Sequence, residues 1–358
     1  MGAGSIATVS GILSFNNARG TLTSSTAGAG SKFIFNSSAA APVQTLAIPI
    51  SSPAAWFYFH VWSENTSTTG LQVVNNIDGS ITGTLRGDIE VRPNSKLQLA
   101  SNVRITGNDT RNFVVSSTNG VFEIVSVAGN PVCPTGYTFN LGTVAPFGTV
   151  LYNSNAARDI AVQTAAPVPI VYGHLKILNN PVSITANRNY TIPNATLTVN
   201  GNLTIGDGVS AFAPNLIGTG AATFLDVKGD INVLGGTLNA TFIPAIRVGG
   251  NWINNSTFTI STGTVEFNGT GTKTIGGTSA STFYNLIVNT LATTDFVQVT
   301  KDVTVNNVLA LTQGGLDLVD ATNVGRTLTL VNPATTAMTR TGGYIKGERL
   351  ISSASVPF

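Results

Sequence analysis

The stretch Thr196–Ile205, TLTVNGNLTI, places two alternating runs of apolar and polar residues on either side of an Asn-Gly-Asn bend. Alternation with period two predicts short strands with one buried face, and Gly and Asn allow the chain to turn between them. Because successive side chains of a strand point to opposite faces, we expect Val199, Leu203 and Ile205 in the core. The stretch predicts two strands around a bend, and no amphipathic helical pattern competes with it.

The same phrase recurs along the chain. Its template is an apolar residue, any residue, Gly or Lys, Asn or Asp, an apolar residue, any residue, and usually Ile or Val. The copies are LRGDIEV from Leu85, VNGNLTI from Val199, VKGDINV from Val227, VGGNWIN from Val248 and VTKDVTV from Val299. A longer internal repeat relates GTVLYNSNAARDI from Gly148 to GTVEFNGTGTKTI from Gly263. Repeats of this kind are typical of stacked architectures with coils of roughly twenty to thirty residues.

These patterns predict an all-β chain folded as a right-handed parallel β-helix (β-solenoid) with irregular coils. The alternative is an array of antiparallel β-sandwich modules. We expect residues 1–75 to form an N-terminal cap or a partly irregular β segment. Residues 76–135 should form β-helical coils, and residues 136–358 a β-helical repeat region continuous with them.

The low charge of the chain limits the kinds of molecule that it is expected to bind. Only 9% of the 358 residues are charged, and 18 Lys and Arg against 16 Asp and Glu leave a net charge of +2. This balance argues against a nucleic-acid partner. No apolar run is long enough for a membrane helix, so we expect no membrane insertion. The single cysteine, Cys133, cannot form an internal disulfide. The chain starts without signal-peptide features, and we expect it to be part of a longer protein.

A glycine-rich stretch, Phe267–Gly277 (FNGTGTKTIGG), resembles a phosphate-binding loop. A P-loop needs adjacent Gly and Lys between a strand and a helix, whereas Thr272 separates Gly271 from Lys273 here. The corresponding segment in the other copy of the longer repeat, NAARDI, has no glycine. We therefore interpret the stretch as a turn between strands.

The repeat phrases resemble the repeat regions of large, adhesin-like cell-surface proteins of Bacteroidota that are exported by type IX secretion. The resemblance rests on GNWINNSTFTISTGTVEFNGTGTKTIGGTSASTFYNLIVN, DVTVNNVLALTQGGLDL and TGGYIKGERL. It is close over residues 140–350 and looser over 75–130. It implies a β-helical, surface-exposed module and brings no catalytic residues with it. The sorting domain of that family is not in this sequence.

Residues capable of acid–base or metal chemistry are few. Asp88, Asp230 and Asp302 occupy the template position that Asn202 and Asn251 hold in other copies. Asn cannot serve as a general base, so this position indicates a bend-forming role. Stacked Asp side chains would be the one route to a calcium site; otherwise we expect no cofactor.

Three further features have a structural interpretation. The pair Asp317 and Asp320 is interpreted as a solvated bend rather than a catalytic dyad. The sequence RGD, Arg86 to Asp88, lies inside a repeat phrase and is attributed to chance. Of the two histidines, His174 is expected to point outward without a special role.

The remaining candidate is WFYFHVW, Trp56 to Trp62. As a strand it would direct Trp56, Tyr58, His60 and Trp62 to one face and Phe57, Phe59 and Val61 to the core. The first face is either additional core or an exposed aromatic surface suited to sugar rings.

The sequence therefore predicts a non-catalytic structural or adhesive module of a secreted bacterial cell-surface protein, a stiff β-helical spacer that presents binding surfaces. Its partners would be an extracellular or cell-surface polysaccharide or neighbouring modules of the same protein. The alternative is a carbohydrate-binding module that uses the Trp56–Trp62 face. A polysaccharide-degrading β-helix enzyme and an ice-binding protein are less favoured, because the acids are dispersed and the Thr-x-Thr triplets do not recur at a fixed interval.

Overall fold

We analysed a computed structural model of the chain. It describes residues 6–9, 13–14, 32–38, 43–47, 60–74, 77–78, 87–99, 103, 105–106, 111–125, 136–154, 158–159, 170–179, 187–210, 212–220, 223–319, 324–347 and 350–352. The described chain forms two compact units, unit 1 (Met1–Leu175) and unit 2 (Lys176–Phe358).

Unit 1 contains two main sheets of parallel strands. The strands of sheet I are, in spatial order, β1 (Ile6–Val9), β3 (Lys32–Phe35), β5 (His60–Ser63), β8 (Ile89–Val91), β11 (Asn112–Val115), β13 (Thr138–Leu141) and β16 (Val171–Tyr172). Those of sheet II are β2 (Leu13–Ser14), β4 (Thr45–Ala47), β6 (Leu71–Val73), β9 (Lys96–Leu99), β12 (Val121–Ile124) and β14 (Thr149–Ser154). The short strands β7 (Ile77–Asp78) and β10 (Ile105–Thr106) pair with each other, and β15 (Arg158–Asp159) follows β14.

Strands from the predicted N-terminal segment belong to these same two sheets. β5 pairs in parallel with β8, and β6 pairs in parallel with β9. Each coil of unit 1 thus passes once through sheet I and once through sheet II.

In unit 2 the earlier coils, up to β27 (Thr257–Ile260), have a third side formed by sheet V. The strands of sheet III are β19 (Thr196–Val199), β22 (Phe224–Val227), β25 (Ala245–Val248), β28 (Thr264–Phe267), β30 (Ser281–Asn289), β32 (Val303–Gln313), β34 (Leu328–Leu330) and β37 (Leu350–Ser352), and β35 (Met338–Arg340) also pairs with β32. Those of sheet IV are β20 (Leu203–Ile205), β23 (Ile231–Val233), β26 (Trp252–Asn254), β29 (Lys273–Gly276), β31 (Phe296–Val299), β33 (Gly315–Asp317) and β36 (Tyr344–Lys346). Those of sheet V are β18 (Arg188–Ile192), β21 (Pro214–Gly218), β24 (Thr237–Ala240) and β27 (Thr257–Ile260).

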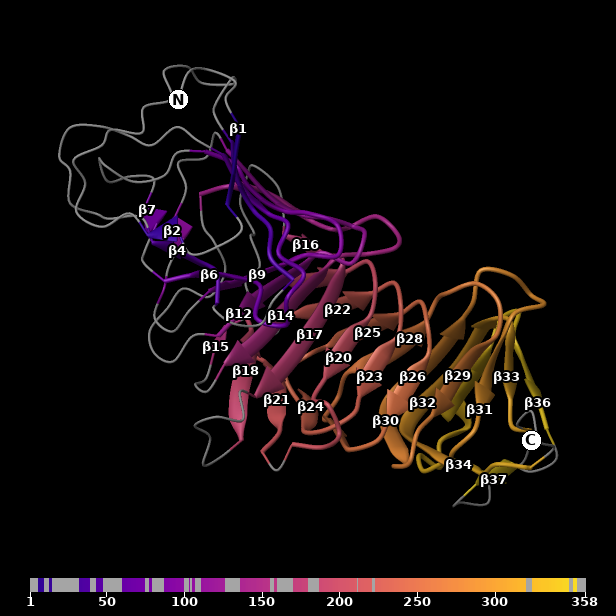
Figure 1. Ribbon diagram of the computed structural model, residues 1–358. Helices are drawn as coiled ribbons and strands as arrows, with labels where there is room; N and C mark the ends of the chain where they lie inside the picture. Colours follow the sequence, from indigo (N-terminus) through magenta and orange to yellow (C-terminus); the bar gives the residue numbers. More distant parts are fainter. Residues whose placement is uncertain are drawn as a thin grey trace. The chain divides into compact units, whose positions relative to one another are not determined.

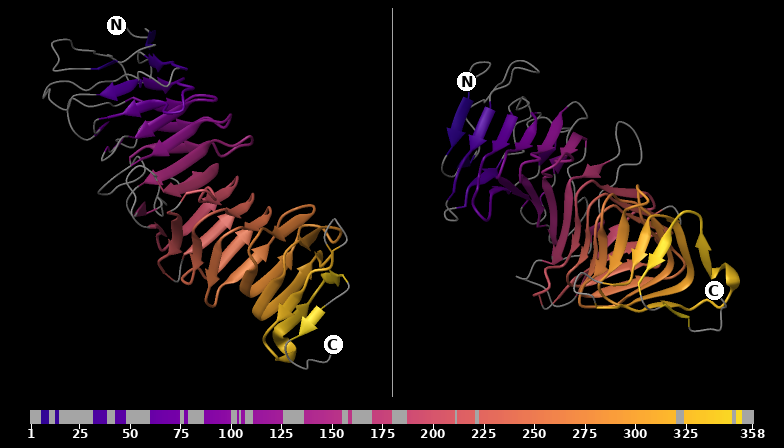
Figure 2. Two further views of the ribbon diagram at one scale, coloured as in Figure 1. Left: turned by 60° about the horizontal axis from the view of Figure 1, so that its bottom comes forward. Right: turned by 90° about the vertical axis from the view of Figure 1, so that its right-hand side faces the viewer.

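Two elements complete the list, the strand β17 (His174–Asn179), which crosses the boundary between the units, and the short 3₁₀ helix η1 (Thr335–Ala337). Figure 1 shows β20, β23, β26 and β29 of sheet IV side by side in sequence order, and Figure 2 shows the strands of unit 2 stacked in the same direction.

The strand pairings confirm the predicted parallel β-helix. Every pairing between described strands is parallel, and the one antiparallel contact among the described residues is an isolated bridge between Val319 and Gly325. The antiparallel sandwich alternative is therefore wrong. Parallel pairing follows from the coil itself, because each strand meets its counterpart from the next turn running in the same direction.

The core consists of columns of apolar side chains, one from each coil. Val199, Val227 and Val248 are direct neighbours in sheet III, and Phe267 and Val288 continue their column. All five are completely buried. Leu203 and Ile205 are buried in the same way in sheet IV, which confirms the predicted core positions. The recurrence of the phrase at Val199, Val227 and Val248 therefore reports the length of each coil.

The phrase specifies a bend rather than one particular corner of the coil. From Val199 it leads out of sheet III into sheet IV, whereas from Val299 it leads out of sheet IV into the long strand β32 of sheet III. The stretch Phe267–Gly277 likewise contains a turn, residues 268–272 between β28 and β29, and Gly271 in it has φ of 70°. This confirms the turn interpretation of the glycine-rich stretch.

The Asn or Asp of the phrase links its own coil to the next one. In all five copies its Oδ1 accepts a hydrogen bond from the backbone N–H one coil further along. The donors Asn112, Asp230, Asn251, Thr274 and Thr327 lie 2.8, 2.9, 2.7, 2.9 and 2.9 Å from Oδ1 of Asp88, Asn202, Asp230, Asn251 and Asp302, respectively. We call these bonds the Asx ladder. Asn and Asp are interchangeable in it because only a carbonyl-type oxygen is needed.

The shape of the coil changes after β27, the last described strand of sheet V. The nine-residue strand β30 and the eleven-residue strand β32 follow on the sheet III side. A buried cluster lies at this change, where Trp252 packs edge-on against Phe258 and Phe283 and donates from Nε1 to Ser281 Oγ at 3.0 Å. The indole therefore has both an apolar environment and a hydrogen-bond acceptor.

The Asx ladder generates a first prediction. Asp230→Ala removes the acceptor of the Asn251 N–H and should lower the free energy of unfolding by about 1–3 kcal/mol, because a half-buried donor loses its partner. Asp230→Asn keeps the oxygen and should change stability by less than about 0.5 kcal/mol. Urea unfolding, with hydrogen exchange at the Asn251 amide, measures both variants. Equal destabilisation by Ala and Asn would show that the acceptor oxygen is not what matters.

Candidate functional site

The structure describes part of the aromatic segment Trp56–Trp62. Trp56 and Tyr58, together with Phe57 and Phe59, lie outside the described residues, whereas His60, Val61 and Trp62 are in β5. Val61 is completely buried, and His60 and Trp62 are half-buried on the opposite, outward face. The predicted alternation of faces holds for these three residues.

His60 takes the place of an Asx residue in the ladder. Val61 and Ile89 are direct neighbours in sheet I, which sets His60 beside Asp88, the residue that accepts from Asn112. His60 Nδ1 lies 3.1 Å from the Asp88 backbone nitrogen and 3.0 Å from Asp88 Oδ2. A neutral imidazole accepts the backbone N–H, and a protonated one pairs with the carboxylate. His60 therefore has a structural role in joining two coils.

The surroundings of Asp88 favour its ionised form. Burial raises the pKa of Asp88, but the hydrogen bond with His60, the N–H of Asn112 and the charges of His60 and Arg111 together hold that pKa below its ordinary value of 3.8. Nearby, burial and the Asp88 charge raise the pKa of Tyr137 well above its ordinary range. The Tyr137 hydroxyl has no hydrogen-bond partner in the part of the chain that the structure describes.

One face of the Trp62 ring is occupied by Arg92. The guanidinium carbon of Arg92 lies 4.4 Å from the centre of its ring, in the geometry of a cation–π contact. Arg92 is held there by Glu90, at 2.6 Å from Nη1, and by Glu64, at 3.9 Å from Nε. A sugar ring stacking on this side of the indole would have to displace the arginine.

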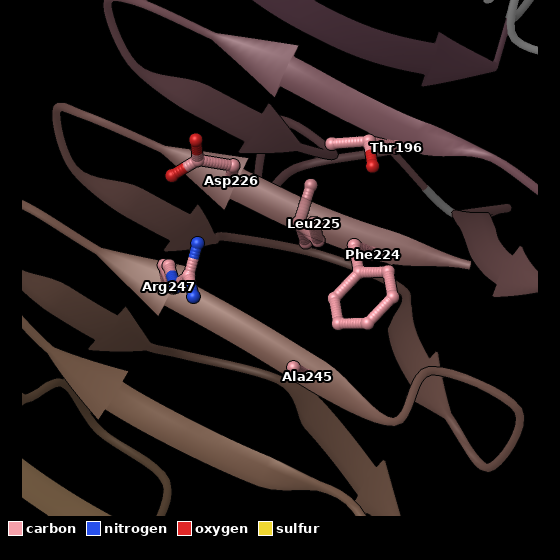
Figure 3. A pocket seen from close by; sticks show the side chains of 6 residues that line it. All are labelled: Thr196, Phe224, Leu225, Asp226, Ala245 and Arg247. Atoms are coloured by element: carbon pink, nitrogen blue, oxygen red, sulfur yellow. The ribbon is translucent and has the colours of Figure 1, made fainter. Parts of the chain in front are cut away.

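A second outward feature lies on sheet III of unit 2. Thr196, Phe224 and Ala245 are neighbours on three successive strands, and the Phe224 side chain is 41% exposed. A shallow depression of about 290 Å³ is lined by these three residues with Leu225, Asp226 and Arg247. Figure 3 shows Phe224 beside Ala245 at the start of their strands and Asp226 beside Arg247 further along the same strands. The small Ala245 leaves room next to the aromatic ring.

Paired charges border this depression. Lys228 Nζ donates to Asp226 at 2.8 Å, and Arg247 Nε lies 3.3 Å from Glu266 Oε2. Asn289 Nδ2 also donates to Glu266, at 2.8 Å. The two acids and two bases cancel, so the depression combines an apolar ring with fixed hydrogen-bonding groups and little net charge.

A smaller depression of about 230 Å³ lies at the bend that leads into β25. It is lined by Thr241, Phe242, Ile243, Pro244, Thr262 and Gly263. Phe242 is 59% exposed, and Pro244 directly precedes Ala245 of the first depression. Two exposed phenylalanines thus lie along one corner of successive coils.

The interpretation of Asp317 as part of a solvated bend is wrong. The Asp317 side chain is buried, accepts from Val319 N at 3.0 Å and pairs with Lys346 Nζ at 3.1 Å on the neighbouring strand. Burial is possible because the charge is paired and hydrogen-bonded. Asp320 lies outside the described residues.

The structure also describes the surroundings of the RGD sequence and of His174. Gly87 of the RGD sequence is buried and Asp88 belongs to the Asx ladder, while Arg86 lies outside the described residues. His174 is half-buried, and its ring lies edge-on to that of Phe147.

Within the described ranges, no group of three or more His, Cys, Asp or Glu side chains could hold a metal ion. None of the helices in the described part of the chain is long and apolar enough to span a membrane.

Comparison of the chain with protein-family models, with curated proteins and with solved structures gave no match.

Sequence reasoning missed the depression at Phe224, although a signal for it exists. Aligning the three adjacent copies of the phrase and including the three residues before each gives TLTV, FLDV and AIRV. Because the coils pair in this register, the alignment places Thr196, Phe224 and Ala245 in one outward column and Thr198, Asp226 and Arg247 in the next.

The lowered pKa of Asp88 generates a second prediction. A carboxyl group whose pKa is lower in the folded state contributes stability above its unfolded pKa and loses it as the pH falls through the folded pKa. Wild type should therefore be more stable than Asp88→Asn at pH 6, and this difference should shrink as the pH falls below 3.8. The variant keeps an oxygen for the Asn112 N–H, so the ladder bond itself is preserved.

Urea midpoints at pH 6 and pH 3 measure this difference. Asp302→Asn, a change at the same position of another copy, is the matched control for loss of a ladder charge. A constant difference between wild type and Asp88→Asn across this range would refute the contribution of the ionised carboxylate.

Proposed function

We propose that this chain is a non-catalytic structural or adhesive module of a secreted bacterial cell-surface protein. It serves as a stiff β-helical spacer that presents binding surfaces outside the cell. Its partners are an extracellular or cell-surface polysaccharide or neighbouring modules of the same protein. The resemblance to type IX-secreted, adhesin-like repeat proteins of Bacteroidota supports this location.

The observation that carries the proposal is the Asx ladder. It joins consecutive coils by side-chain hydrogen bonds in addition to the parallel strand pairing, at all five copies of the phrase. Solenoids of this kind derive their stability from contacts between neighbouring repeats. A ladder made of Asn and Asp oxygens needs no cation, which suits a spacer whose stiffness is independent of calcium.

The acids of the phrase support a non-catalytic role. Asp88, Asp230 and Asp302 each use an oxygen to hold the next coil. An acid–base pair needs carboxyl groups that face one another across a substrate cleft. The dispersed ladder positions are occupied by structural hydrogen bonds instead, so we do not favour a polysaccharide-degrading enzyme.

Two other candidates have less support. The Trp62 ring carries Arg92 on one face, which disfavours a carbohydrate-binding module centred on Trp56–Trp62. The triplet Thr196-Leu197-Thr198 has Phe224 and Asp226 as its neighbours in the next coil. It therefore belongs to no flat threonine array of the kind that would match an ice surface.

The stiffness of the coils generates a third prediction, tested by single-molecule pulling of the whole chain between its termini. The double variant Asn202→Ala/Asp230→Ala should lower the unfolding force of unit 2, because two consecutive ladder bonds are lost. The exchange Asn202→Asp/Asp230→Asn, which keeps both oxygens, is the matched control and should leave the force unchanged. Addition of EDTA should have no effect. Extension of the wild-type chain without resolved unfolding events would refute the spacer.

A further inference from the structure

We propose that the depression at Phe224 and Ala245 binds a neutral polysaccharide, with one sugar ring stacked on Phe224. This inference rests on the proposed function in one respect: it assigns a site and a ligand class to the adhesive role. It does not depend on the stiffness of the coils, nor on the segment Trp56–Trp62.

Phe224 presents a ring that is both accessible and held by a regular strand. It lies at the start of β22, between Thr196 on β19 and Ala245 on β25. The next residue, Leu225, is buried in the core and anchors the strand position. A sugar ring has an apolar C–H face that suits an aromatic ring, and here the ring lies beside a depression rather than alone on a flat surface.

Ala245 creates the space for the ligand. Its register neighbours are Phe224 on one side and Thr264 on the other, and its own methyl group leaves the depression beside the ring open. The volume of about 290 Å³ is close to the lower end of roughly 300–1,000 Å³ for ligand pockets. The site therefore fits a small unit of a longer chain.

The polar groups beside the ring match sugar hydroxyls. Asp226 and Arg247 lie two residues further along the strands than Phe224 and Ala245, and all four line the depression (Figure 3). A carboxylate and a guanidinium supply an acceptor and donors, and each is ion-paired, Asp226 with Lys228 and Arg247 with Glu266.

The charges beside the depression cancel, and we therefore expect the ligand to be neutral. Asp226, Lys228, Arg247 and Glu266 sum to zero, so the surface has no net field to attract a polyanion. An acidic polysaccharide would compete with Glu266 for Arg247 and would meet the carboxylate of Asp226. Neutral sugars carry no such cost.

The second depression extends the site along one direction. It is lined by Phe242 at the bend that precedes β25, and Pro244 joins it to Ala245. A polymer could place neighbouring sugars near Phe224 and Phe242, whereas a monosaccharide could use only one of the two. We therefore expect polysaccharides to bind more tightly than their monomers.

The test is affinity electrophoresis of the full chain in native gels that contain hydroxyethyl cellulose, xyloglucan, galactomannan or laminarin, with alginate as an acidic comparison. At least one neutral polysaccharide should retard the wild type, and alginate should not. Phe224→Ala should weaken that retardation at least tenfold, and Ala245→Leu, which fills the depression, should do the same. Phe212→Ala is the matched control, because Phe212 is also 37% exposed but lies in the bend between β20 and β21.

The outcomes separate the site from the adhesive role. Circular dichroism and thermal melting establish that each variant is folded, and Ala245→Leu keeps the aromatic ring if Phe224→Ala is destabilised. Loss of retardation in both variants but not in Phe212→Ala supports the site. Unchanged retardation in both variants overturns the site while leaving an adhesin, and alginate-only retardation overturns the ligand class. Absence of retardation by every neutral polysaccharide overturns the inference, while the pulling experiment still decides the spacer role.

Discussion

The structure depends on one recurring type of hydrogen bond. In it, a backbone N–H donates to the side-chain oxygen of an Asn or Asp one coil earlier. At a bend the backbone leaves one sheet before it enters the next, and its N–H groups lose their strand partners there. The Asx ladder supplies an acceptor at this point in every copy of the phrase. Together with the parallel strand pairing, it holds the coils in the register that aligns apolar columns such as Val199, Val227 and Val248 in the core. The rest of each coil can then vary in length.

The low charge of the chain follows from this design. Bends, outward ladders and inter-coil contacts use amides and hydroxyls, which bond to their own kind across successive coils without repulsion. Asn307 donates to Asn285 at 2.9 Å and Asn332 donates to Asn307 at 2.9 Å, as an amide ladder on the outside of unit 2. Ion pairs also lie on these surfaces, among them Asp226 with Lys228 and Arg247 with Glu266. Phe224 is exposed beside two such pairs, and this combination of an apolar ring with paired charges is the basis of the proposed glycan site.

Much of the fold could be predicted from the sequence, because the phrase carries its own register. Alternation identified the strands, the intervals between Val199, Val227 and Val248 gave the coil lengths, and Asn at the position of Asp indicated a structural role. The outward faces could not be predicted equally well. Arg92 lies over one face of Trp62 from the adjoining coil, and the buried Asp317 pairs with a lysine 29 residues later. Both effects depend on side chains from neighbouring strands, and no local pattern records them. The depression at Phe224 depends on Ala245 in the same way.

The bonds of the Asx ladder all have the same direction. In every copy the earlier coil contributes the acceptor and the later coil contributes the N–H. A coil that has already folded therefore presents correctly placed oxygens to the segment that follows it. For a chain that emerges from a ribosome or a secretion pore with its N-terminus first, each completed turn is a template for the next, and growth proceeds in the order of synthesis.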